Sequence, residues 1–452
     1  MTTTRRSLFR HPDFARLWTA STISLFGTQI SQLAIPAIAV LILHVSPFEV
    51  ALLGAFEFLP FLLFTLPAGV WVDRLPRRRI LIGGDLGRAA LLGTIPIAYA
   101  LGALTIWQLY VVGFLMGVLT VFFDVADQSY LPTVVERDQL IEGNAKLQAS
   151  VSTAQVVGQP LGGGAVALLS APFAVILDAV SYLASAMLIF AIRRQERASS
   201  TTPESRVTAA ELGADAPTSG PSLAAESSAG AAPSEEERAG TRQEMIDGLR
   251  FVLGHRYLRN IAAATGSSNL FSNISFGIFP VFVYVELGLT PDAVGLIGGA
   301  FGAGALVGAL IASRIGERFG VGRAIVGAML LSSTGGFGMA FAVHDTALWL
   351  IGATGFLAGI AQVVYNVNQV SLRQAITPEP LLGRMNATMR FLVWGTIPIG
   401  NVVGGLLGTF LGVRVAIWIG ALGGLLPFLP ILFSPVRSLK RIPDPGEAAE
   451  PA

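Results

Sequence analysis

Ionisable side chains inside long apolar runs are the residues of this chain that could do chemistry. Glu57 lies between Phe56 and Phe58 in one such run, and Asp124 and Asp127 lie near the end of another. A charged group inside lipid is costly unless it is paired, solvated or neutral. A carboxyl that is neutral when buried and charged when wet can couple protons to a conformational cycle. We therefore take Glu57, Asp124 and Asp127 as candidates for proton coupling.

Structural roles are the alternative for each acidic residue. Glu57 could form a hydrogen bond to a neighbouring helix, and Asp124 and Asp127 could form ion pairs that close a gate. Asp85 and Arg88 lie about one helical turn apart, so we expect them to pair within a helix. Asp178 lies close to the start of its run.

Neutral polar side chains near the middle of the apolar runs are the candidates for a substrate cavity. Gln155 and Gln159 are spaced i to i+4, as are Asn269 and Asn273, so each pair shares one helix face. The alternative for each residue is a hydrogen bond between helices that never meets a substrate. The full set of candidates is Gln29, Gln32, Gln155, Gln159, Asn269, Asn273, Gln362, Asn366 and the aromatic Trp394.

Apolar runs long enough to span a lipid bilayer as helices must position these residues. Only 13% of the residues are charged, about half the share usual in a soluble domain, and 52% are hydrophobic. The sequence therefore predicts an all-α polytopic membrane protein with twelve transmembrane helices in two six-helix bundles. The runs cover residues 17–43, 48–72, 80–101, 106–125, 147–169, 172–192, 261–285, 293–315, 324–343, 347–367, 387–411 and 415–433.

A polar segment divides the runs into two sets of six. Residues 197–240 are rich in Ala, Ser, Pro, Gly and Glu and lack aromatic residues, which predicts a disordered linker. Residues 241–257 carry apolar side chains at helical spacing with arginines between them, which predicts an amphipathic helix on the membrane surface. The expected order is a first bundle, the linker, the surface helix, a second bundle and a tail, over residues 1–196, 197–240, 241–257, 258–436 and 437–452.

A short basic turn between the second and third runs carries a further motif. It resembles the signature loop of the major facilitator superfamily, which reads G-x-L-a-D-R-x-G-R-K. Pro76 replaces the second glycine of that motif, a change that still suits a tight turn. A membrane anchor with a positive flank would explain the arginines but not this spacing. The resemblance implies a gating role for the matching residues, which are Gly69, Asp73, Arg74, Arg77 and Arg78.

Pro160, Gly163 and Gly164 resemble the fifth-helix motif of proton-coupled exporters, G-x-x-x-G-P-x-x-G-G. Gln155 and Gln159 stand where that motif usually has glycine. Other fragments, such as 177–181 and 383–387, are similar to bacterial exporters related to macrolide efflux proteins and the enterobactin exporter. The resemblance covers nearly the whole chain apart from the linker and the tail. It implies two similar bundles whose first, fourth, seventh and tenth helices line a central cavity.

The same resemblance implies secondary active export of an amphipathic small molecule, such as a drug, a macrolide-like or a siderophore-like compound. It implies proton antiport across the bacterial inner membrane. An importer or facilitator of a small metabolite is the nearer alternative. Such a protein would carry paired charges across its cavity, whereas the candidate cavity here is mostly neutral.

An intramembrane enzyme is the remote alternative. The four histidines lie outside the runs, and the chain has no cysteine, no zinc-protease motif and no phosphate-binding loop. We therefore expect no enzyme activity, metal or cofactor. A net charge of +1 gives no basic field for nucleic acid. The expected partners of a monomeric protein are a small-molecule substrate, protons and the lipid bilayer.

Loop charge predicts the orientation of the chain. Basic residues concentrate in the segments that hold both termini and the linker, whereas the opposite loops are short and contain one basic residue, Arg414. Because basic loops stay in the cytoplasm, both termini are expected there.

Single cysteines test this orientation on a background that contains none. We expect an impermeant maleimide to label Thr346→Cys in intact cells and to leave Ser219→Cys unlabelled until the membrane is permeabilised. Labelling of Ser219→Cys in intact cells, with none at Thr346→Cys, would reverse the topology.

Overall fold

The computed structural model describes residues 8, 11–136, 139–192, 248–378 and 381–441, and every regular element in it is helical. The first half comprises α1 (Pro12–Ala37), the π-helix η2 (Ile38–Ile42), α2 (Pro47–Arg74), α3 (Arg77–Ala100), α4 (Ile106–Val134), α5 (Leu140–Thr153), the π-helix η4 (Ala154–Gly158), α6 (Gln159–Leu169) and α7 (Ala171–Phe190). The second half comprises α9 (Leu258–Phe276), α10 (Phe279–Val281), the π-helix η5 (Phe282–Glu286), α11 (Pro291–Phe319), α12 (Val321–Phe341), α13 (His344–Ala375), α14 (Leu382–Trp394), α15 (Thr396–Phe410), α16 (Val413–Gly423), α17 (Phe428–Leu432) and the 3₁₀ turn η7 (Pro435–Ser438).

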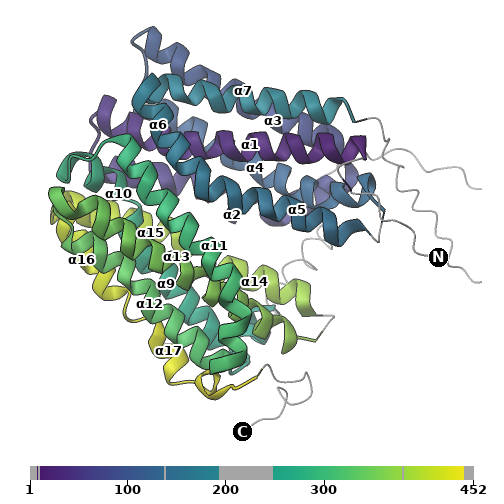
Figure 1. Ribbon diagram of the computed structural model, residues 1–452, viewed down its shortest axis with the longest axis vertical. Helices are drawn as coiled ribbons and strands as arrows, with labels where there is room; N and C mark the ends of the chain where they lie inside the picture. Colours follow the sequence, from purple (N-terminus) through teal and green to yellow (C-terminus); the bar gives the residue numbers. More distant parts are fainter. Residues whose placement is uncertain (1–7, 9–10, 137–138, 193–247, 379–380, 442–452) are drawn as a thin grey trace, which may run out of the picture.

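Eleven helical segments among the described residues are long and apolar enough to cross a membrane. This confirms the predicted all-α polytopic fold. The remaining run predicted from the sequence, 147–169, is also helical, but it is divided into α5, η4 and α6 and packs along α1 (Figure 1). Proline explains the division, because Pro160 lacks an N–H and lies in the first turn of α6, two residues after the end of the π-helix.

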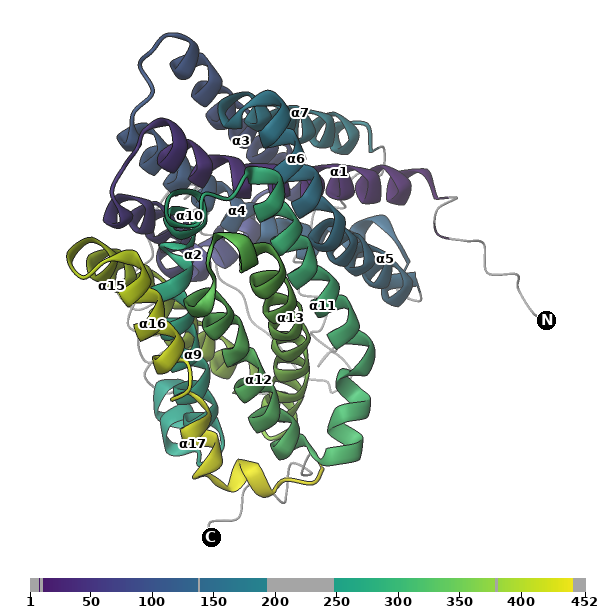
Figure 2. The ribbon, with the colours of Figure 1, turned by 60° about the vertical axis from the view of Figure 1, so that its left-hand side comes forward.

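The two halves form two bundles that meet at one end and splay apart at the other (Figure 1). Helix α7 packs on α1 and α3 in the first bundle, and α13 packs on α11 and α12 in the second. Contact between the bundles comes mainly from α2 with α15 and from α6 with α11. We call the joined side the closed end; it holds the turns at 43–46, 170 and 411–412. The splayed end holds the start of α1 and the end of α17 (Figure 2).

Close backbone approach joins the bundles at the closed end. On α6, a Cβ added to Gly163 would meet the carbonyl oxygen of Pro291 and would lie 2.9 Å from the Cα of Gly295. On the other side, the N–H of Phe48 donates to Thr409 Oγ1 at 3.2 Å. Glycine is required at position 163 because any side chain would push α6 away from α11.

Local sequence fixes where α2 begins and ends. Ser46 and Glu49 form a capping box, in which the Ser46 N–H donates to Glu49 Oε2 at 2.8 Å and the Glu49 N–H donates back to Ser46 Oγ at 3.4 Å. At the other end Leu75 is extended, as expected for the residue before Pro76. The basic turn therefore lies at the splayed end of α2.

The two similar bundles that the family resemblance implies share a feature of the backbone. The first span of each half ends in a π-helix, η2 or η5. Leu43 N–H donates to the Ile38 carbonyl at 3.0 Å, and Leu287 N–H donates to the Phe282 carbonyl at 2.9 Å. The two halves therefore share a wide helical turn at equivalent places, both at the closed end.

The predicted linker, 197–240, lies outside the described residues, as do residues 241–247 of the predicted surface helix, 241–257. Its described part, 248–254, is helical and packs on the second bundle. Val252 is buried there, and a Cβ on Gly248 would lie 2.5 Å from Thr388 Oγ1 on α14.

Two neighbouring glycines test the closed-end contact. Gly163→Ala should destabilise the protein by about 1–3 kcal/mol, because its methyl group would meet backbone that cannot move cheaply. Gly164→Ala is the matched control, since nothing lies within 4 Å of an added Cβ there. Alanine is also the better helix former, so this control should be neutral or stabilising. Thermal unfolding in detergent measures both variants, and equal melting temperatures would contradict the contact.

Candidate functional site

Three of the candidate amides meet between the bundles. Gln159 Nε2 on α6 donates to Gln29 Oε1 on α1 at 2.7 Å, and it lies 3.4 Å from Gln32 Oε1. Gln29 is buried, whereas Gln32 is exposed. The Gln159 side chain also faces α11, because a Cβ on Gly298 would lie 2.9 Å from its Oε1. The structure thus brings Gln29, Gln32 and Gln159 into one polar cluster beside the inter-bundle contact.

Other candidate amides lie apart from this cluster. Gln155, Gln362 and Asn366 are exposed, and Asn366 Oδ1 accepts a hydrogen bond from Gln369 Nε2 at 3.1 Å. The Gln155 carbonyl packs on α11, since a Cβ on Gly302 would lie 2.6 Å from it.

Asn269 and Asn273 donate their amide hydrogens to backbone. Asn269 Nδ2 binds the carbonyl oxygen of Val393 at 3.0 Å and so ties α9 to α14. Asn273 Nδ2 binds the Asn269 carbonyl at 2.8 Å within its own helix. These two bonds are structural, which leaves the amide oxygens of both residues as the groups that could meet a substrate.

Trp394 stands where α2 meets α14. Its ring packs edge-on to Phe61 with centroids 5.9 Å apart, and the Arg390 guanidinium lies 5.0 Å from its centroid. Trp394 and Arg390 are both exposed, so the stacked pair faces open space rather than core. Arg390 is not among the candidates predicted from the sequence, although its i to i+4 spacing from Trp394 places both side chains on one helix face.

Glu57 lies on α2 between Gly54 and Phe61, two residues that contact the second bundle. A Cβ on Gly54 would lie 3.0 Å from Asn401 Nδ2 on α15, and Phe61 meets Trp394. Glu57 is exposed, and the described residues offer it no hydrogen bond or ion pair.

Asp124 and Asp127 occupy α4 toward the splayed end. Asp124 is exposed and feels the charges of Arg88 on α3 and Arg390 on α14. Asp127 is half-buried and feels the charges of Asp124, Asp85 and Arg88. Asp124 thus stands between a buried arginine in its own bundle and an exposed arginine in the other.

Two arginines of the basic turn bind backbone carbonyls of neighbouring helices. Arg77 Nη1 donates to the Ser129 carbonyl on α4 at 3.1 Å, and Arg78 Nε donates to the Ile189 carbonyl in the last turn of α7 at 3.3 Å. At the end of α7 the cation satisfies a free carbonyl. The side chains of the other motif residues, Gly69, Asp73 and Arg74, lie outside the described part of the structure.

The fifth-helix motif residues differ in their contacts. Gly163 touches α11 as described above, and Pro160 packs on the same helix, since its Cγ would lie 2.5 Å from a Cβ on Gly299. Gly164 has no neighbour within 4 Å of an added Cβ. Two of the three residues therefore build the inter-bundle contact.

A buried ion pair fulfils one expectation of the sequence. Arg88 Nη2 binds Asp85 Oδ1 at 2.6 Å within α3, as their spacing predicts. Asp178 on α7 is fully buried and feels the charges of both Asp85 and Arg88. Sequence alone gave no signal that these three residues share one place.

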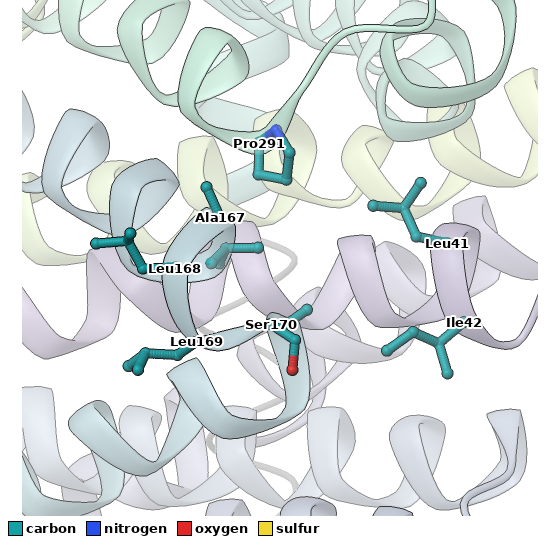
Figure 3. Close-up of a pocket in the computed structure, with 9 residues that line it drawn as sticks. Leu41, Ile42, Ala167, Leu168, Leu169, Ser170 and Pro291 are labelled. Carbon is teal, nitrogen blue, oxygen red and sulfur yellow. The ribbon is translucent and has the colours of Figure 1, made fainter.

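A shallow apolar groove of about 470 Å³ opens at the closed end between η2, α6 and α11. Figure 3 shows Leu41 and Ile42 on one side of it, Ala167 to Ser170 on the other and Pro291 above. None of the candidate residues lines it. The groove therefore lies apart from the candidate site.

Two family models match the sequence. The one described as "Transmembrane secretion effector" matches residues 3–215, and the one described as "Major Facilitator Superfamily" matches residues 261–452. Together they cover both bundles.

Several bacterial transporters are similar in sequence. The uncharacterized MFS-type transporter YfiS of Bacillus subtilis (strain 168) is 28% identical over 42% of this chain and 44% of its own length, so the match spans less than half of that relative. The multidrug efflux pump Tap of Mycolicibacterium fortuitum is 26% identical over 79% of this chain and 80% of its own. Macrolide efflux protein A of Streptococcus pyogenes is 28% identical over 32% of this chain and 35% of its own.

Solved structures share the fold. A bacterial homologue of the iron transporter ferroportin in an inward-facing state covers 94% of this chain and 99% of its own, with a TM-score of 0.71 and 15% identity. The nucleoside transporter NupG covers 93% and 98%, with a TM-score of 0.63 and 9% identity. With two joined bundles and family models that match both halves, the chain belongs to the major facilitator superfamily, as a multi-pass secondary transporter and not an enzyme.

Proposed function

We propose that this transporter exports an amphipathic small molecule across the bacterial inner membrane by proton antiport. The observation that carries the proposal is the one-sided arrangement of the bundles. Backbone contacts join them at the closed end, while Glu57, Asp124, Arg390 and Trp394 are exposed on helices that diverge toward the other end. A site that is reachable from one side only is what alternating access requires.

Loop charge supports an inward-facing state. The splayed end carries the basic turns, among them Arg77 to Arg79, Arg318 with Arg323, and Arg384. Since basic loops face the cytoplasm, the splayed end is the cytoplasmic one and both termini lie there. The exposed site in this conformation would then load substrate from the cytoplasm.

The chemistry of the site favours an amphipathic substrate. Phe61 and Trp394 offer aromatic surface, and the cluster of Gln29, Gln32 and Gln159 offers neutral hydrogen-bonding groups. Two similar proteins are named for efflux of macrolides and of multiple drugs. These names support export of a hydrophobic compound with polar groups rather than uptake of a small charged metabolite.

Glu57 is our first candidate for the coupling carboxyl. It is exposed here, and it sits on the face of α2 that meets the second bundle. Closure of the splayed end would bring the bundles together around it. Because burial disfavours the ionised form of a carboxyl, a proton taken up on closure would be released when the site is wet again.

Charge also supports a role for Asp124. It stands across the splayed space from Arg390, and opposite charges attract more strongly as water is excluded. Closure would favour this pair, so that Asp124 and Arg390 would help to hold the splayed end shut. The same pair would be separated and wet in the conformation described here.

Transport into everted membrane vesicles tests the function. Vesicles from an expressing strain should accumulate at least one member of a panel of macrolides and other amphipathic drugs above the level in vesicles that lack the protein. A protonophore should abolish the accumulation, because it dissipates the gradient that drives antiport. Accumulation by right-side-out vesicles instead would identify an importer, and accumulation that survives the protonophore would exclude proton coupling.

Glu57→Gln is the matched variant for the same assay. Glutamine keeps the shape and hydrogen-bonding capacity of the side chain but cannot release a proton. Uphill accumulation should fall to the level of equilibration, while binding of the same compound, followed by tryptophan fluorescence, should persist. Full uphill transport by Glu57→Gln would move the coupling role to Asp124 or Asp127.

A further inference from the structure

The first bundle encloses an ionic cluster that the proposed transport site does not use. Asp85 and Arg88 on α3 and Asp178 on α7 have exposed fractions of 0%, 5% and 0%. Arg88 Nη2 donates to Asp85 Oδ1 at 2.6 Å. Three ionisable side chains are thus removed from water inside a membrane-spanning bundle, where each charge must be compensated.

Aromatic rings hold Arg88 in place. Its guanidinium lies 4.0 Å from the ring centroid of Phe123 on α4 and 4.3 Å from that of Tyr182 on α7. The Tyr182 hydroxyl in turn hydrogen-bonds Thr28 on α1 at 2.9 Å. Arg88 Nε has no partner among the described residues, so the guanidinium retains one unused donor.

Helix α1 seals the cluster over Asp178. A Cβ added to Gly27 would lie 2.5 Å from Asp178 Oδ1 and would collide with Ser181 Oγ. Ser181 Oγ lies 3.1 Å from Asp178 Oδ1 and also donates to the Asp178 carbonyl at 2.8 Å. One hydroxyl is therefore shared between two acceptors, which is weak compensation for a full negative charge.

Unpartnered polar atoms gather at the same place. Asp85 Oδ2 and Asp178 Oδ2 have no hydrogen-bond partner among the described residues. The hydroxyls of Ser31 and Ser185 lie beside Asp178 and Asp85, respectively, without normal hydrogen-bond geometry. Each carboxyl thus retains an oxygen that could carry a proton, next to a hydroxyl that could accept a hydrogen bond from it.

The charges do not balance without a proton. Two carboxylates and one guanidinium leave one negative charge, and the only ionisable groups that α4 adds nearby are the acids Asp124 and Asp127, which also act on Arg88. Helix α7 adds Tyr182 beside Arg88, and this side chain is neutral. An uncompensated buried charge is strongly destabilising. One bound proton removes that cost.

We propose that Asp178 and Asp85, sharing Arg88, form a proton-binding site enclosed in the first bundle. In this conformation Arg88 pairs with Asp85, so the proton resides on Asp178. Loss of the proton to water leaves an Asp178 carboxylate that attracts the same guanidinium. The site goes beyond the proposed export function, since it binds a proton whatever the substrate.

The two carboxyls lie at different depths. By the helical rise, Asp85 is about 12 Å along α3 from its start at the splayed end, and Asp178 is about 10 Å along α7 from its start at the closed end. Arg88 stands one turn beyond Asp85, toward the closed end. If Arg88 changed its partner from Asp85 to Asp178, positive charge would move along the membrane normal. The protonation of the site is thereby linked to conformation.

Infrared spectroscopy of the purified full chain in lipid at neutral pH tests the proposal without a substrate. A protonated carboxyl absorbs as a carbonyl apart from the carboxylates, and an enclosed one should shift only slowly in heavy water. We expect such a band in the unmodified protein. Its frequency should shift when aspartate is labelled with ¹³C at the side-chain carboxyl, and it should not shift when glutamate is labelled. No band, or a band that shifts with glutamate label only, would overturn the proposal.

Three variants locate the proton. Asp178→Asn should lose the band, whereas the control Glu57→Gln should keep it. Asp85→Asn should lose it as well, because Arg88 is then free to pair with Asp178 and no proton is needed. A merely structural Asp178 would give no such loss at Asp85. Persistence of the band in either aspartate variant would overturn the assignment, and neither result depends on whether the export assay succeeds.

Discussion

A charge inside a membrane-spanning bundle must be neutralised by neighbouring groups, and this constraint determines how the helices of the first half pack. The Asp85–Arg88 pair is buried at 2.6 Å, with aromatic rings on α4 and α7 around the guanidinium. Four helices therefore surround this cluster. Helix α3 carries Arg88, α4 and α7 place aromatic rings against its guanidinium, and α1 covers Asp178. A break in this pairing would leave a buried charge that the surrounding helices could not solvate.

The two bundles divide the charges between them. Among the described spans, acids away from the helix ends occur in the first half, as Glu57, Asp85, Asp124, Asp127 and Asp178. The second half contributes arginines to the facing surface, of which Arg390 stacks on Trp394 and Arg373 lies 3.4 Å from Asn386 Oδ1. Of these acids only Glu57 and Asp124 are exposed, whereas Asp85 and Asp178 are buried within the first bundle.

The sequence was sufficient for features that depend on spacing along one helix. Apolar runs predicted the spans, Pro76 was compatible with the turn that follows α2, and the interval between Asp85 and Arg88 predicted their ion pair. It failed for features that depend on how helices pack. Gly163 and Gly164 are identical in sequence terms, yet only the first touches α11. Asp178 lies some ninety positions from Arg88 in the chain, and nothing local to it indicates that α7 presents it to α3.

The glycine contact between α6 and α11 has a consequence for how easily the closed end can part. Glycine has no side-chain rotamers, so bringing Gly163 against Gly295 immobilises none, whereas ordering a long side chain costs up to about 2 kcal/mol. The contact also contains no side-chain hydrogen bond that must be broken before separation. A backbone contact of this kind is rigid once it has formed, and forming it again costs almost no side-chain conformational entropy. This suits a closed end that must separate and rejoin in every transport cycle.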